Sequence, residues 1–157
     1  EGLDIPVTVV ASSPWSRRRD QTKNRPVPAN VHLRQGLSSV ELRQLYREAA
    51  LVVVPLQHVD SPAGVTSILE AQAVCRPVIV SASPGIMDAV EPGRTAVTVP
   101  CGDSKAMRAA ILDLSENREK AEAIAQAGHE AVVQAKTIDH FVNRIRKICL
   151  QAEGGAQ

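Results

Sequence analysis

Short runs of β-branched and other apolar residues alternate along the chain with longer stretches of helical periodicity. The five runs are residues 5–12, 30–35, 50–56, 76–82 and 95–100. Three of them are continuously apolar, as expected for strands that helices cover on both faces. Because parallel neighbours need a crossover connection, strands separated by helices indicate a parallel sheet. We therefore predict an α/β fold: a Rossmann-like, doubly wound parallel sheet of about five strands, in a single domain with a helical C-terminus.

The first helical stretch begins at a residue pair typical of helix starts. Ser38 and Glu41 have the spacing of a capping box, in which each side chain bonds the backbone of the other. One apolar stripe follows at helical spacing. It contains Leu42, Leu45, Tyr46 and Ala49.

Two further helical regions follow the last strand. One is expected to begin at Asp103 or Ser104 and to bury a single face. That face contains Met107, Ala110, Ile111 and Leu114. The pattern then continues over 117–151, with a break into two helices indicated by Gly128 and by 137–139.

The remaining segments set the expected domain limits. Residues 1–151 are predicted to form one domain, and 152–157 a disordered tail. Inside the domain, 13–29 is polar, basic and proline-rich without periodicity, which indicates a mobile loop. Its basic run, 16–19, could contact phosphate or nucleic acid. Short charge runs are more often solvated surface, and we interpret this one so.

Composition excludes several classes of partner. The chain has 157 residues, 44% of them hydrophobic, and a net charge of +1, so nothing in its bulk charge attracts nucleic acid or anionic lipid. Aromatic residues make up only 2%, too few for a base-stacking surface. No apolar run approaches the ~20 residues that span a bilayer. We expect no nucleic-acid partner and no membrane span.

Residues that could bind metals or form disulfides show no suitable spacing. Cys75, Cys101 and Cys149 are odd in number and far apart, which favours reduced thiols in the cytoplasm. The four histidines show no metal-ligand spacing. They are His32, His58, His129 and His140. We expect no metal and no cofactor.

The turn at 57–67 follows the third predicted strand, where open parallel sheets bind ligands. Gly64 would let the backbone approach a ligand closely. The N–H groups of residues 64–67 would be the unpaired donors of a helix start, which favours phosphate.

Glu70 follows one turn later and allows two interpretations. A carboxylate beside a phosphate makes chemical sense if it accepts hydrogen bonds from the two hydroxyls of a ribose. Alternatively, Ser67 and Glu70 form a capping box, and Thr66 or Ser67 is simply an N-cap. From this spacing alone the two interpretations are about equally supported.

Read as a whole, the central region resembles the C-terminal, nucleotide-sugar-binding domain of retaining GT-B glycosyltransferases of the group 1 type. The resemblance rests on "LYREAALVVVPL" followed by "GVTSILEAQAVCRPVIVSASPGIMDAVEPGRTAVTVPCGD". It covers roughly residues 30–135. It implies transfer of a sugar from an NDP-sugar to an acceptor hydroxyl, without a metal.

The resemblance also implies roles for individual residues. Glu70 matches the second glutamate of the family's E-x7-E motif, a ribose-hydroxyl acceptor. The loop that meets the diphosphate and the donor sugar is matched by Ala63, Gly64, Val65 and Thr66. Arg34 and Gln35 match positions that frame the base. Pro84 and Gly85 match a turn near the same crevice.

The chain departs from the family pattern at several points. Pro62 stands where the first glutamate of E-x7-E is expected, a role that Asp60 could fill. Cys75 replaces the usual helix-ending glycine, which should reduce stability unless that residue avoids the left-handed conformation. The acceptor domain and the opening strand and helix expected before Glu1 are missing. The truncated face could support a homodimer.

We therefore predict a nucleotide-sugar-binding domain that is catalytically incomplete without its acceptor domain; none of its residues is assigned a certain catalytic role. Two alternatives remain. The first is a non-catalytic interaction module on a glycosyltransferase-like scaffold, consistent with Pro62. The second is a phospho-receiver, which lacks support because the first strand ends "VVASSP" without an acidic pocket.

Overall fold

The computed structural model of the chain describes residues 5–10 and 27–154. They fall into two compact units, 1–42 and 43–157, which are described separately. Most of the predicted loop 13–29, including its basic run, lies outside the described residues, as do the last three residues of the predicted tail.

The first unit contains two parallel strands, β1 (Val7–Val10) and β2 (Val31–Arg34). They pair with Val7 opposite Val31, and the Val7 N–H donates to Asn30 O at 2.8 Å. The valines of β1 keep between 36% and 39% of their surface exposed. This strand is therefore exposed along its whole length.

The predicted capping box precedes α1 (Ser39–Glu48), the helix in which the two units meet along the sequence. The Ser38 N–H donates to Glu41 Oε2 at 2.8 Å, and the Glu41 N–H donates to Ser38 Oγ at 3.3 Å. These bonds from Ser38 lower the pKa of Glu41. The interaction is local in sequence, which is why the pattern alone could predict it.

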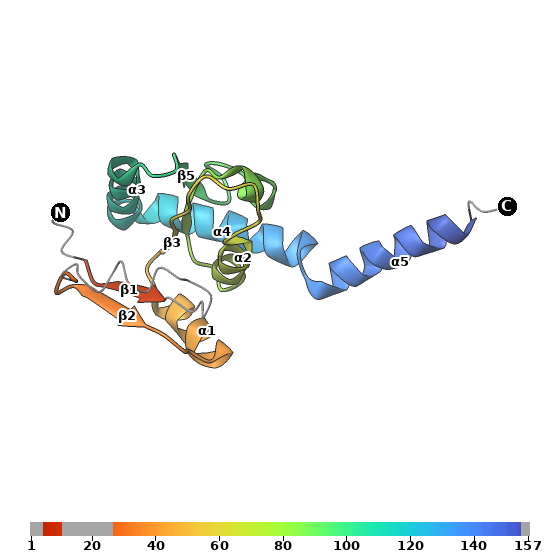
Figure 1. The fold of residues 1–157 in the computed structure, drawn as a ribbon, viewed down its shortest axis with the longest axis horizontal. Coiled ribbons are helices and arrows are strands. Elements are labelled where there is room, and N and C mark those ends of the chain that lie inside the picture. Colours follow the sequence, from red (N-terminus) through yellow and green to blue (C-terminus); the bar gives the residue numbers. More distant parts are fainter. Residues whose placement is uncertain (1–4, 11–26, 155–157) are drawn as a thin grey trace. The chain divides into compact units, whose positions relative to one another are not determined.

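The second unit is built on a parallel sheet with the order β3-β4-β5. Its strands are β3 (Val52–Val54), β4 (Val78–Ser81) and β5 (Val97–Val99). Figure 1 labels its two outer strands, β3 and β5. The α/β class and the parallel direction of all five described strands are confirmed. The strands belong to a two-stranded and a three-stranded sheet rather than to one ladder.

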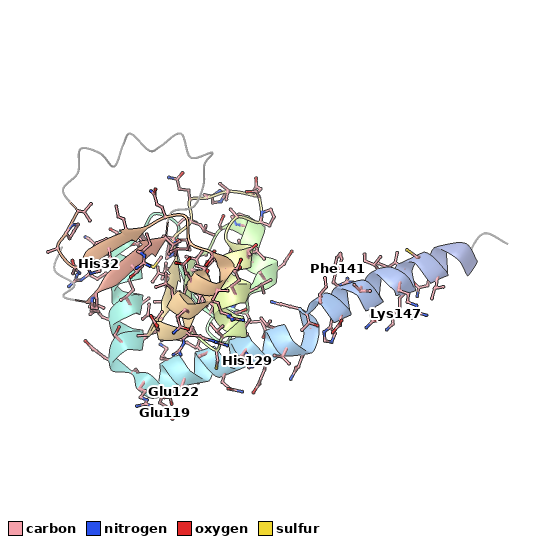
Figure 2. All side chains as sticks on the ribbon, turned by 90° about the horizontal axis from the view of Figure 1, so that it is seen from below. His32, Glu119, Glu122, His129, Phe141 and Lys147 are labelled. Atoms are coloured by element: carbon pink, nitrogen blue, oxygen red, sulfur yellow. The ribbon has the colours of Figure 1, made fainter. Side chains whose placement is uncertain are left out.

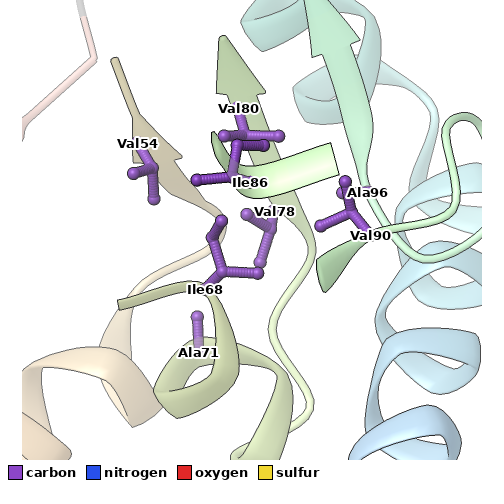
Figure 3. Close-up of a cluster of buried hydrophobic side chains, with 8 residues drawn as sticks. All are labelled: Val54, Ile68, Ala71, Val78, Val80, Ile86, Val90 and Ala96. Carbon is purple, nitrogen blue, oxygen red and sulfur yellow. The ribbon is translucent and has the colours of Figure 1, made fainter. Parts of the chain in front are cut away.

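Successive residues of β4 are buried against helices on opposite faces of the sheet. Val78 and Val80 pack in a cluster with Ile68 of α2 (Val65–Ala73) and Ile86 of η2 (Pro84–Ala89) (Figure 3). Ile79 belongs to a second cluster, together with apolar residues of β5 and of the two helices that follow β5 in the chain. Burial on both faces explains the continuously apolar sequence of β4.

The C-terminal half is helical: α3 (Ser104–Glu116), α4 (Arg118–Ala135) and α5 (Ile138–Gly154). Asp103 is the N-cap of α3 and accepts hydrogen bonds from the N–H groups of Lys105 and Ala106, as predicted. Gly128 does not break α4. A Cβ there would lie 3.0 Å from Gln72 Cγ, so glycine permits close packing of α4 on α2.

The helix α5 presents an apolar stripe that is exposed to solvent. Ile138 exposes 72% of its surface and Phe141 61%. Phe141 projects from the helix, and no described element covers it (Figure 2). Val142, Ile145 and Ile148 continue the stripe at spacings of three and four residues and are also exposed. A helix with this pattern normally buries such a stripe.

Cys75 adopts the left-handed conformation at the end of α2, with φ of 57°. The Cys75 N–H donates to Gln72 O at 2.9 Å and the Arg76 N–H to Ala71 O at 3.0 Å, the two bonds of a Schellman motif. The cost that the sequence predicted for a residue with a Cβ at this position is therefore present.

Cys75→Gly is expected to stabilise the chain by about 0.5–1 kcal/mol, because glycine adopts positive φ without strain. The gain is smaller than the relieved strain, since glycine also increases the entropy of the unfolded chain. Urea unfolding monitored by circular dichroism measures it. Cys101→Gly is a control at a cysteine without positive φ, where we expect no gain. A loss of stability in Cys75→Gly would contradict the assignment of strain.

Other features of the described residues bear on the predictions. No described helix is both long and apolar enough to cross a membrane. The same residues contain no cluster of metal-ligating side chains. All three cysteines are free thiols.

Candidate functional site

The carboxyl ends of β3 and β4 lie side by side, because the two strands are parallel neighbours. Ligands of open parallel sheets bind at this edge. Residues 55–64 leave β3 there and lead into α2, and residues 82–83 leave β4 and lead into η2. The predicted residues 63–66 and Glu70 follow this edge along the chain.

Two buried serines at the end of β4 fasten the segment that leaves β3. Ser81 Oγ accepts a hydrogen bond from the Leu56 N–H at 3.0 Å. Ser83 Oγ accepts one from the Val59 N–H at 3.0 Å and donates one to Val59 O at 2.7 Å. The Gly85 N–H donates to the same oxygen at 3.2 Å. These bonds set the path of the chain toward α2.

Ser83→Ala is expected to lower the free energy of unfolding by about 1–3 kcal/mol, because it leaves the Val59 N–H without its partner. We also expect faster proteolysis within residues 57–63, measured by limited digestion. Ser115→Ala is the matched control: that exposed hydroxyl donates to Ile111 O within α3. Equal effects of the two substitutions would show that Ser83 does not fasten this segment.

The helix α2 starts without a side-chain cap. Its N-cap residue is Gly64, with φ of 85°, so neither Thr66 nor Ser67 is the N-cap. At this helix start the Val65 N–H donates to Pro62 O at 3.3 Å and the Ala63 N–H to Ser61 O at 2.7 Å. The N–H groups of Thr66 and Ser67 have no intrahelical partner, and the helix start carries a partial positive charge, which suits a phosphate. A Cβ on Gly64 would lie 2.9 Å from Val54 Cγ1. Packing and conformation thus require glycine here, whether or not a ligand approaches.

Glu70 lies on the second turn of α2 and is exposed. The Tyr46 hydroxyl donates a hydrogen bond to Glu70 Oε2 at 3.2 Å. The capping box that Ser67 and Glu70 could form is not present, since α2 has no side-chain cap and Ser67 is inside the helix. The predicted capping-box role of Glu70 is therefore wrong. Its carboxylate can still accept a hydrogen bond from another donor.

The other predicted residues lie in different places. Arg34 ends β2 and, with the exposed Gln35, belongs to the first unit, described by itself. There Arg34 contributes to lowering the pKa of Glu41, after the bonds from Ser38. Pro62 and Asp60 are both exposed in the segment that precedes α2.

The sequence did not indicate Ser83 or the second role of Tyr46. Tyr46 was placed on the apolar stripe of α1, and its ring does pack against the core that contains Ile68. The hydrogen bond from its hydroxyl to Glu70 cannot be inferred from the periodicity. For Ser83, the signal was the pair of small polar residues, with Ser81, at the end of an otherwise apolar strand.

A separate hollow of about 270 Å³ lies between η2 and the C-terminal part of α4. Its polar groups are largely paired with one another: Arg94 contacts Glu91 Oε2 at 2.6 Å, and Lys136 Nζ donates to Ala89 O at 2.5 Å. Burial lowers the pKa of Lys136. None of the predicted site residues lines this hollow.

Comparison with known families identifies the chain. Residues 7–131 match the family described as "Glycosyl transferases group 1". The chain belongs to this family. The match includes β1, the segment that precedes α2, Glu70 and most of α4. No curated protein matches the sequence.

Several solved structures share the fold of this group 1 domain. Sucrose-phosphate synthase from Thermosynechococcus elongatus is 26% identical, with a TM-score of 0.75, over 96% of this chain and 39% of its own. HepE from Anabaena, in complex with UDP-glucose, is 20% identical with a TM-score of 0.65, over 78% and 33%.

A third neighbour is itself a C-terminal domain. It is that of the group 1 glycosyl transferase LpcC from Francisella tularensis, 19% identical with a TM-score of 0.61, over 69% of this chain and 55% of its own. The likeness confirms the predicted Rossmann-like fold of a GT-B C-terminal domain. The chain spans between a third and just over half of the length of these three structures.

Proposed function

We propose that this chain is the donor-binding domain of a glycosyltransferase that transfers a sugar from an NDP-sugar to an acceptor hydroxyl. The observation that carries the proposal is the carboxylate of Glu70 beside the uncapped start of α2, at the carboxyl edge of a parallel sheet. A helix start attracts a diphosphate, and a carboxylate accepts hydrogen bonds from a ribose. A nucleotide-sugar presents both groups in sequence.

We take the remaining contacts from the resemblance to the family. The backbone of Ala63–Thr66 would meet the diphosphate and donor sugar, and Glu70 the ribose. The resemblance assigns the base to Arg34 and Gln35, which belong to the first unit. The complex of HepE with UDP-glucose supports a nucleotide-sugar as the ligand class.

Turnover requires more than this chain in our proposal. Positive charge must stabilise the diphosphate as it leaves, and an acceptor must be held in place. An N-terminal acceptor domain would supply these groups. The exposed apolar stripe of α5 supports a further covering surface, since Phe141 and Ile138 are left in solvent.

The second candidate function is a non-catalytic interaction module on the same scaffold. Pro62 in place of the first glutamate of E-x7-E and the stripe of α5 favour it. It predicts a folded domain without affinity for nucleotides. The two functions therefore differ in a direct binding measurement.

The test is titration of UDP, GDP, ADP and dTDP into the chain, followed by calorimetry and ligand-observed NMR. Saturable binding of one of them at micromolar to millimolar concentration is expected, and uridine or the matching nucleoside should bind more weakly because it lacks the diphosphate. Absence of binding by all four at millimolar concentration would contradict donor binding by this chain and favour the interaction module. Light scattering of the same samples reports self-association.

A further inference from the structure

Tyr46 connects the apolar core of the second unit to the carboxylate of the proposed site. Its ring is half-buried and packs against the cluster that contains Ile68 and Val78. Its hydroxyl emerges from that packing and donates to Glu70 Oε2 at 3.2 Å. The two residues are 24 positions apart, on α1 and α2. The packed ring of Tyr46 thus holds its hydroxyl against the exposed carboxylate of Glu70.

The carboxylate of Glu70 depends on this contact for its orientation. A glutamate on an exposed helical turn samples many rotamers, and ordering it upon ligand binding reduces affinity. Among the described residues, the hydrogen bond from Tyr46 is the side-chain interaction recorded for Glu70. It engages Oε2, and no described residue donates to Oε1. With Oε2 held by Tyr46 and Oε1 available, the carboxylate is oriented to accept hydrogen bonds from two adjacent ribose hydroxyls.

The Tyr46 hydroxyl stays protonated at neutral pH and can therefore donate to Glu70. Burial raises the pKa of Tyr46, and the negative charge of Glu70 raises it further, while a contact with Ser67 acts in the opposite direction. The net direction is upward, so the hydroxyl remains a donor at neutral pH. The hydroxyl can therefore donate to Glu70 Oε2 at neutral pH.

We propose that Tyr46 is a positioning residue that orients Glu70 for two-point recognition of a ribose diol, and so sets the preference for ribonucleotides over 2′-deoxyribonucleotides. The proposal rests on the nucleotide-binding function proposed above. Tyr46 does not touch the nucleotide itself. Its effect is exerted through Glu70, because an oriented carboxylate gains more from the second hydroxyl than a mobile one does.

The test uses Tyr46→Phe in the full chain, which keeps the ring and removes the hydroxyl. UDP, GDP and ADP are each titrated together with their 2′-deoxy forms. For the nucleotide that binds, Tyr46→Phe is expected to weaken binding of the ribo form about 3- to 10-fold and the deoxy form less, so that their ratio falls toward one. In a Glu70→Gln background the same substitution should have no further effect on the ratio.

Val52→Ala is the matched control for loss of packing. Val52 packs against the same cluster as Tyr46. We expect it to lower stability without changing the ribo-to-deoxy ratio. An equal change in the ratio in Val52→Ala, or an unchanged ratio in Tyr46→Phe, would overturn the positioning role.

The outcomes distinguish this proposal from the function on which it rests. If ribonucleotides bind and Glu70→Gln abolishes their preference while Tyr46→Phe leaves it intact, only the role of Tyr46 fails. If no nucleotide binds, the proposed function fails, and the role of Tyr46 is overturned with it. If binding occurs but Glu70→Gln leaves it unchanged, the ribose role of Glu70 fails, and that of Tyr46 with it.

Discussion

Glu70→Gln is expected to weaken binding of the nucleoside diphosphate about 10- to 100-fold while the domain stays folded. The substitution keeps the size of the side chain and removes its charge, and hydrogen bonds to a charged acceptor are stronger than those to a neutral one. The amide can also present an N–H to a ribose hydroxyl in place of an acceptor. Calorimetric titration of the wild type and the variant measures the change.

Stability separates a loss of binding from a loss of structure in this experiment. Glu70 is exposed, and Tyr46 is the one described side chain that donates to its carboxylate, so we expect the free energy of unfolding to change by no more than about 0.5 kcal/mol. Glu130→Gln is the matched control, an exposed glutamate on α4 that accepts a bond from Gln126 at 2.8 Å. Loss of nucleotide affinity in the control, or unchanged affinity in Glu70→Gln, would refute the ribose contact.

Gly85→Ala is expected to be the most damaging single substitution at this edge, with a loss of about 2–4 kcal/mol of stability. A Cβ at this position would lie 2.0 Å from Ser61 O and 2.7 Å from Asp60 O. These are backbone atoms of the segment that leads into α2, so no side chain can rotate to make room. The segment must move, and the bond from the Gly85 N–H to Val59 O at 3.2 Å is strained or lost.

Binding should fail together with stability in this variant. The displaced residues lie directly before Ala63 and Gly64, whose backbone is proposed to meet the diphosphate. Urea unfolding and nucleotide titration of Gly85→Ala measure both effects. Gly93→Ala is the control, because a Cβ there meets nothing within 4 Å and only the positive φ of 76° opposes the substitution. We expect this control to lose about 1–2 kcal/mol of stability. A smaller loss in Gly85→Ala than in the control would contradict the packing argument.

Ser83 and Gly85 have the same structural effect. Both hold the segment after β3 against the end of β4, one by hydrogen bonds to Val59 and the other by close approach to Ser61. A binding loop held in this way needs less ordering when a ligand arrives. The proposed site is therefore built from two neighbouring strand ends, those of β3 and β4.

Local features of the chain could be predicted because their causes lie within a few residues. The capping box of Ser38 and Glu41, the N-cap Asp103 and the buried strand β4 all follow from spacing or composition over one or two turns. Element boundaries are harder to predict: in the sequence Gly128 indicates a break in α4, whereas in the structure its missing side chain permits contact with Gln72. A glycine has the same appearance in sequence in either case.

The parallel α/β class, the family and the place of Glu70 after the third predicted strand could be inferred without a structure, because strand-helix alternation and the motif are encoded along the chain. The bonds between Ser83 and Val59 and between Tyr46 and Glu70 become apparent only in the folded chain. Each of these pairs is separated by 24 residues, and its members meet only when helices and strands have packed. Side-chain partners at such separations depend on crossover geometry and core packing, which no local pattern specifies.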